Sequence, residues 1–109
     1  MSARLATSVL VSALLKKAEA EGGFGAVLAR GDSTAGSVLV ILVERGADPR
    51  FYERLLQPDG SYAWNTGNSA PTDVPGFIAR KRRFDPDLWV LELDIPVRER
   101  FAAEMNAFG

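Results

Sequence analysis

Residues 38–43 form an unbroken apolar run, Val-Leu-Val-Ile-Leu-Val, in a chain of 109 residues. A strand with one face in water alternates apolar and polar side chains, and this run has no polar position. It therefore predicts a central strand that is covered on both faces. At roughly 25 cal/mol per Å² of apolar surface, leaving one row of these side chains in water would forgo several kcal/mol, which is comparable with the whole stability of a small domain. Helices of the chain or a second copy must therefore cover the second face.

Further strands and turns are expected on either side of this run. Residues 24–30 and 37–44 flank the small and polar residues 31–36, which predicts a hairpin. Near the end of the chain, the turn Asp85-Pro86-Asp87 is followed by a strand over residues 88–95, because proline sets φ near −65° and keeps the preceding aspartate out of helical space.

A second hairpin is expected in the middle of the chain. Residues 51–57 and 61–64 have strand composition and flank the turn Pro58-Asp59-Gly60. A short helix over 51–57, begun by Asp48-Pro49, is the alternative, and we favour the strand. Residues 65–71 are Asn, Thr, Gly, Ser, Ala and Pro only, which predicts a surface loop.

Apolar residues spaced three and four apart predict three amphipathic helices. The first begins near Thr7, and the second runs over residues 74–83. The third follows Pro96 and places its apolar side chains at Val97, Phe101, Met105 and Phe108. We expect Thr7 or Ser8 to cap the first helix and Thr72 to cap the second, because a side-chain oxygen there accepts a free amide hydrogen of the first turn.

Together these elements predict a single α+β domain over residues 1–109. Its sheet is expected to have four to five strands, antiparallel or mixed, packed with two to three helices. A mixed sheet is possible because the last strand is reached through a helix.

The composition removes several functional classes. The chain has no histidine and no cysteine, so it lacks the commonest bases, nucleophiles and transition-metal ligands. We therefore assign no catalytic residue and expect no cofactor. Thirteen basic and fourteen acidic side chains give a net charge of −1, so no global field attracts nucleic acid or an anionic membrane. Without disulfides, a signal-peptide pattern or a long apolar run, we expect a cytoplasmic protein that does not enter a membrane.

Several short segments carry a family resemblance. They are the early Val-Ser-Ala-Leu-Leu-Lys-Lys helix, residues 30–36, Tyr52-Glu53-Arg54, Asp59-Gly60, Trp64, and above all residues 83–89 (Arg-Phe-Asp-Pro-Asp-Leu-Trp) followed by Glu92. In this combination the chain resembles the small alphaproteobacterial DUF1491 family, which is known only as a domain of unknown function. The resemblance implies a short intracellular bacterial protein with a single domain. It brings no catalytic residues to transfer.

Acidic residues near the last strand are the candidate metal ligands. Asp85, Asp87 and Glu92, with Asp94 and Asp32 as further members, would suit Mg²⁺ if their oxygens converged, and would then support a hydrolase or nuclease-like activity. A turn beside a proline selects aspartate for other reasons, and Glu92 alternates with apolar residues as the wet face of a strand does. We favour this second interpretation and assign no metal.

The basic run is the candidate contact for nucleic acid. Arg80, Lys81, Arg82 and Arg83 are consecutive, and each cation could neutralise a phosphate. Cations in the last turn of a helix also offset its dipole, and four consecutive residues spread around the helix axis. We therefore favour a structural role for the run over nucleic-acid binding.

Large aromatic residues are the candidate protein contacts. Tyr52, Trp64 and Trp89 lie in predicted strands, where most such residues build the core, but exposed together they would mark a binding surface. Because the central strand is apolar on both faces and no catalytic set is present, we favour a non-enzymatic interaction module. Its sheet face or edge would hold a protein partner or a second copy of the chain.

Overall fold

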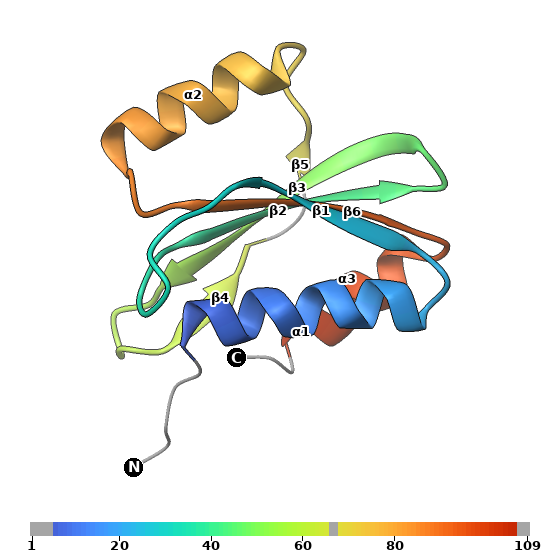
Figure 1. Ribbon diagram of the computed structural model, residues 1–109, viewed down its shortest axis with the longest axis horizontal. Coiled ribbons are helices and arrows are strands. Elements are labelled where there is room, and N and C mark those ends of the chain that lie inside the picture. The colour runs from blue at the N-terminus through green and yellow to red at the C-terminus, as the bar shows by residue number, and fades with distance from the viewer. Residues whose placement is uncertain (1–5, 66–67, 107–109) are drawn as a thin grey trace.

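The computed structural model describes residues 6–65 and 68–106, which form three helices and a six-stranded mixed sheet (Figure 1). In chain order the elements are α1 (Thr7–Ala20), β1 (Phe24–Ala29), β2 (Val38–Glu44), β3 (Ala47–Leu56), β4 (Tyr62–Trp64), β5 (Asn68–Ser69), α2 (Val74–Phe84), β6 (Trp89–Ile95) and α3 (Arg98–Met105). The strands lie in the order β1-β6-β2-β3-β4, and β5 also pairs with β3. The predicted α+β class is confirmed.

Strand β2 is central, as its apolar run predicts. It pairs in parallel with β6 and antiparallel with β3, so the sheet is mixed. Its first five residues, Val38 to Leu42, are each at most 1% exposed. Val38, Val40 and Leu42 pack in one core cluster with residues of α1 and α3, whereas Leu39 and Ile41 pack in a second cluster against α2. Both faces of the strand are therefore covered by the chain itself.

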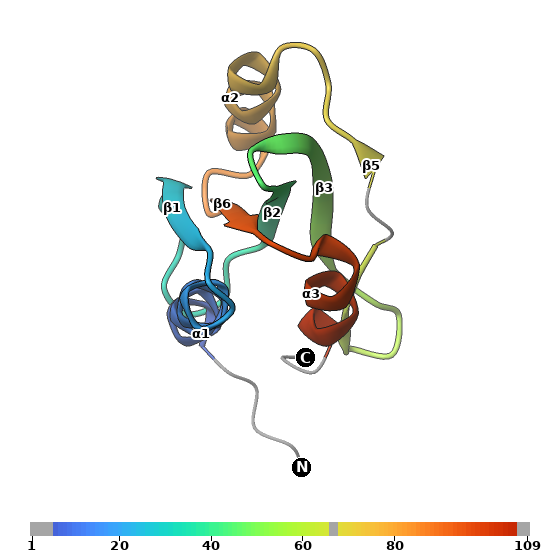
Figure 2. The ribbon, with the colours of Figure 1, turned by 90° about the vertical axis from the view of Figure 1, so that its right-hand side faces the viewer.

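Helices α1 and α3 seal one face of the sheet, and both lie on the same side of it in Figures 1 and 2. α1 buries Leu10, Leu14 and Ala18 completely, because these residues recur on one side of the helix. α3 buries Phe101 and Met105 in the same cluster. The predicted Phe108 lies outside the described residues.

Helix α2 lies alone on the opposite face and packs less deeply. None of its residues is buried. It rests on the sheet through Val74, Phe77 and Ile78, which are partly buried. Its N-cap is Asp73, whose Oδ1 accepts a hydrogen bond from the Gly76 amide at 3.1 Å, and not the expected Thr72. One face of the sheet is thus tightly covered and the other only in part.

The predicted hairpin of 24–30 with 37–44 is wrong. β1 and β2 do not pair with each other, because β6 lies between them and pairs with both. The connecting residues 31–36 therefore cross the end of β6 instead of forming a tight turn. Gly31 and Gly36 permit this crossing, since a Cβ at either position would lie within 2.3 Å of the Asp87 carbonyl oxygen.

The same connection replaces the predicted cap of α1. Ala6 is the N-cap residue, and no side chain caps the helix. The first amides, of Thr7 and Ser8, donate to the carbonyls of Thr34 and Ser33 at 3.2 and 2.9 Å. The Thr7 hydroxyl donates to the carbonyl of Gly36 at 3.1 Å, so this side chain secures the loop instead of the helix.

The middle of the chain follows the strand alternative. Residues 51–57 lie in or directly after β3, which is ten residues long and forms the predicted hairpin with β4. The predicted loop over 65–71 contains the two-residue strand β5, which pairs with β3 at Arg50 and Phe51. This short strand is why the sheet exceeds the expected four to five strands.

The unequal packing of the two faces predicts unequal costs for the same substitution. Phe101→Ala on α3 removes a fully buried ring and is expected to lower the free energy of unfolding by about 3–5 kcal/mol. Phe77→Ala on α2 removes a partly buried ring and is expected to cost about half of that or less. Urea unfolding followed by tryptophan fluorescence measures both, and equal losses would contradict the packing described.

Candidate interaction surface

A groove lies on the partly covered face, between α2 and the outermost strand β1. Its volume is about 390 Å³, and its lining includes Phe24, Ala26, Val43, Val74, Glu92 and Asp94. In Figure 2, α2 lies above β6 and β2, and β1 lies to one side of it, above α1. We call this hollow the β1 groove. It exists because a single helix is too narrow to cover all the strands of the face.

Strand β1 forms an edge of the sheet that carries no protective charge. Among the described strands it pairs with β6 only. Its sequence, Phe-Gly-Ala-Val-Leu-Ala, contains neither a charged residue nor a proline, the two devices by which edge strands commonly prevent pairing with other chains. Phe24 is 67% exposed and Leu28 is 46% exposed. The edge therefore combines free backbone groups with exposed apolar side chains.

Two carboxylates lie in the floor of the β1 groove. Glu92 pairs with Ala26 across the β1–β6 ladder, and Asp94 pairs with Phe24. The Glu92 side chain is exposed and makes no hydrogen bond or ion pair with any residue that the structure describes. Asp94 Oδ1 accepts a hydrogen bond from the Gly46 amide at 3.2 Å. The groove is thus apolar at its rim and negative at its floor.

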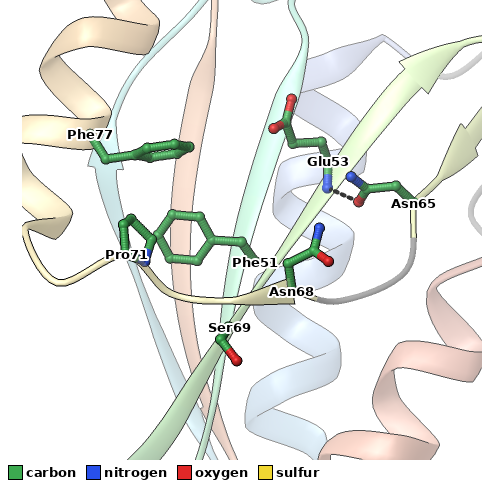
Figure 3. A pocket seen from close by; sticks show the side chains of 7 residues that line it. All are labelled: Phe51, Glu53, Asn65, Asn68, Ser69, Pro71 and Phe77. Carbon is green, nitrogen blue, oxygen red and sulfur yellow. Dashed lines mark hydrogen bonds between the residues drawn. The ribbon is translucent and has the colours of Figure 1, made fainter.

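A second hollow, of about 280 Å³, lies on the opposite side of α2 (Figure 3). The rings of Phe51 and Phe77 form one wall, with centroids 5.2 Å apart and planes tilted by 59°. On the other wall, the Asn65 side-chain oxygen accepts a hydrogen bond from the Glu53 amide at 2.6 Å. Hollows on both sides of the helix agree with its shallow packing.

The structure does not bring the candidate acidic residues Asp85, Asp87 and Glu92 together at one place in the part of the chain that it describes. Asp85 Oδ1 accepts a hydrogen bond from the Asp87 amide at 3.2 Å, so these two residues build the turn around Pro86. Asp32 similarly accepts from the amides of its own loop. Glu92 lies apart, in the β1 groove. Within residues 6–65 and 68–106, no group of three acidic, histidine or cysteine side chains is placed to hold a metal ion.

The four residues of the basic run make different contacts. Lys81 Nζ lies 2.7 Å from Glu53 Oε1, which joins α2 to β3. Arg82 donates to the carbonyl of Arg30 at 2.7 Å. Arg80 and Arg83 are exposed, with no carboxylate of the described residues within ion-pair distance. The four cations therefore do not form one continuous face for phosphates.

Of the three aromatic candidates, the structure buries Trp89 and leaves Tyr52 and Trp64 partly exposed. Trp89 is buried at 3% exposure, and its indole donates to the carbonyl of Asp32 at 2.7 Å. Tyr52 and Trp64 are partly buried and line one hollow of about 350 Å³ beside α3. Phe24 and Leu28, which are more exposed, were not among the sequence candidates. The uncharged composition of residues 24–29 was the available signal, but it acquires meaning only once β1 is known to be an edge.

Comparison with known proteins assigns the chain to a family. A family model described as "Protein of unknown function (DUF1491)" matches residues 5–103. The chain belongs to the DUF1491 family. This membership confirms the resemblance noted in the sequence.

Three solved structures share this fold. A crystal structure of a DUF1491 family protein from Caulobacter crescentus is 33% identical, with a TM-score of 0.75 over 89% of this chain and 94% of that one. An NMR structure of a DUF1491 family protein from the same organism is 33% identical, with a TM-score of 0.74 over 86% and 88%. A solution structure of a protein from A. tumefaciens is 27% identical, with a TM-score of 0.74 over 91% and 92%. No curated protein matches the chain.

The three described helices are α1, α2 and α3. In residues 6–65 and 68–106, none of them is both long enough and apolar enough to cross a bilayer.

The start of β3, where Pro49 borders the β1 groove beside Gly46 of the preceding turn, is anchored to α3 by an ion pair. Arg98 Nη2 lies 2.9 Å from Asp48 Oδ2, and the Arg98 guanidinium also donates to the Asp48 carbonyl. The hydrogen bond from Arg98 holds the pKa of the Asp48 carboxyl below its usual 3.8, with a smaller contribution from Arg50. Asp48 has a φ of 50°, which asparagine also tolerates.

Asp48→Asn is therefore expected to lower stability in a pH-dependent way. Because the folded-state pKa is lowered, the carboxylate's contribution is present above the unfolded value and is lost as pH falls through the folded one. The difference in free energy of unfolding between wild type and variant should be greatest near neutrality and shrink over the acidic range below the ordinary carboxyl pKa of 3.8. Urea titrations across this range measure it. A difference that is constant with pH would contradict the ion pair.

Proposed function

We propose that this protein is a non-enzymatic interaction domain that binds a partner polypeptide at the edge of β1 and in the β1 groove. One observation carries the proposal: β1 is an uncharged edge strand whose Phe24 is 67% exposed beside that groove. An added strand would pair with the free backbone groups of β1, while its side chains would contact Phe24 and Val43. Backbone pairing supplies affinity in this mode, and the groove supplies specificity.

A second copy of the chain fits this surface less well than another polypeptide. If β1 paired with β1 of a second copy, Glu92 and Asp94 of both copies would lie on one continuous sheet face. Strand β1 contains no lysine or arginine to offset these carboxylates. Pairing with a second copy would therefore leave the carboxylates of Glu92 and Asp94 without a cationic partner. We therefore favour a different protein as the partner and treat self-association as an outcome of the test.

Selection of peptides tests the proposal. A displayed library of random peptides, long enough to span β1, is selected on the immobilised full chain, and the enriched peptides are then bound in solution. Phe24→Lys places a charge on the edge and removes an apolar contact of about 1.5–3 kcal/mol, so it is expected to weaken binding by about tenfold or more. Leu56→Lys is the matched control, because Leu56 is a strand residue with a similar exposure of 61%.

Three results decide the matter. Binding that is weakened by Phe24→Lys but not by Leu56→Lys supports the β1 surface. Equal binding by both variants, or a library that yields no binder, contradicts it. Circular dichroism of each variant verifies the fold, and sedimentation equilibrium of the wild type shows whether the chain itself occupies the surface.

A further inference from the structure

We infer that the polypeptide bound at β1 is an extended segment with a lysine or arginine directly opposite Ala26 and an apolar residue opposite Phe24. This inference rests on the proposed function and names the chemistry of the partner. It follows from the register of β1 with β6 and from the charge of the β1 groove.

The register places Ala26 between the added strand and Glu92. Ala26 pairs with Glu92, and both residues line the β1 groove, so their side chains lie on the same face of the sheet. The residue of an added strand that lies opposite Ala26 points to that face as well. Neighbouring strands are 4.7–4.9 Å apart, so the backbone of the added residue would lie roughly 10 Å from the backbone of Glu92. Only a long side chain spans this distance.

The small side chain of Ala26 leaves that path open. A lysine or arginine can lay its apolar stem across the methyl group of Ala26 and place its charged end at the Glu92 carboxylate. Glu92 is exposed and has no partner among the described residues, so no existing contact has to break. Asp94 lies two residues further along the same strand and adds a second negative charge. No cation of the described residues lies within ion-pair distance of either carboxylate.

The neighbouring position selects an apolar side chain. Phe24 lies two residues before Ala26 and is 67% exposed on the same face. The residue opposite Phe24 would cover this ring, with Val43 and Val74 behind it in the groove. Cross-strand pairs between aromatic and β-branched side chains are favourable, so valine or isoleucine suits this position. The resulting pattern is an apolar residue and a basic residue separated by one residue.

The charge of the groove also excludes two other occupants. Phosphate groups would face the carboxylates of Glu92 and Asp94, so the surface does not suit nucleic acid. Strand β1 of a second copy carries no cation and would leave Glu92 unpaired. A segment of another protein that carries both a basic and an apolar residue can pair with the backbone of β1 and also neutralise the carboxylates in the floor of the β1 groove.

A cycle of substitutions tests the contact with Glu92. From the peptides enriched on the full chain, one with the expected pattern is synthesised in two forms, with arginine or with glutamine at the basic position. Each form is titrated into wild type, Glu92→Gln and the control Glu99→Gln, whose exposed carboxylate lies on α3. We expect Glu92→Gln to weaken the arginine peptide about two- to fivefold and to leave the glutamine peptide unchanged. Glu99→Gln should affect neither, and added salt should weaken the arginine peptide only.

The outcomes separate the inference from the proposed function. Enriched peptides without a recurrent basic position, or an equal effect of Glu92→Gln on both peptide forms, would overturn the inference while binding sensitive to Phe24→Lys still supported the β1 surface. Binding that is insensitive to Phe24→Lys would overturn both. A dimer that Phe24→Lys dissociates would show that the occupant is a second copy, and this also overturns the inference.

Discussion

The burial of β2 on both faces is the constraint on which the rest of the structure depends. Its residues Val38 to Leu42 are almost fully inaccessible, so each face of the sheet needs its own cover. α1 and α3 together cover one face and bury large side chains such as Leu10 and Phe101. α2 alone covers the other, directly over the apolar side chains of β2 and β6. The strand therefore requires a three-layer arrangement even in a short chain.

The unequal covers explain why the candidate surface lies where it does. A single helix protects the middle of its face and leaves the sides open, and β1 lies beyond it at the edge. The same edge is supported from below by α1, while Phe24 and Leu28 of β1 remain exposed. Packing of the interior and exposure of the surface thus have one cause, which is the number of helices on each face.

Much of the fold could be predicted from local sequence patterns. The wrong pairing of β1, the wrong cap of α1 and the missed surface have a common origin. The run at 38–43 correctly indicated a central strand, and the turn at Pro58-Asp59-Gly60 indicated the hairpin of β3 with β4. The pairing of β1 with β2 was wrong because no local signal shows that β6 inserts between them. The cap of α1 was wrong for the same reason, since Thr7 is held by Gly36, 29 residues away. The candidate surface was missed because an edge is defined only by the order of all strands.

Residue-resolved native-state hydrogen exchange tests most directly whether one face of the sheet is sealed and the other open. We expect amides in the middle of β2, β6 and α1 to exchange only through global unfolding, because these elements share the closed core. Amides of α2, which buries no residue, should exchange through a local opening of clearly lower free energy. If the amides of α2 are protected as strongly as those of β2, both faces are equally sealed and the explanation offered for the open surface is wrong.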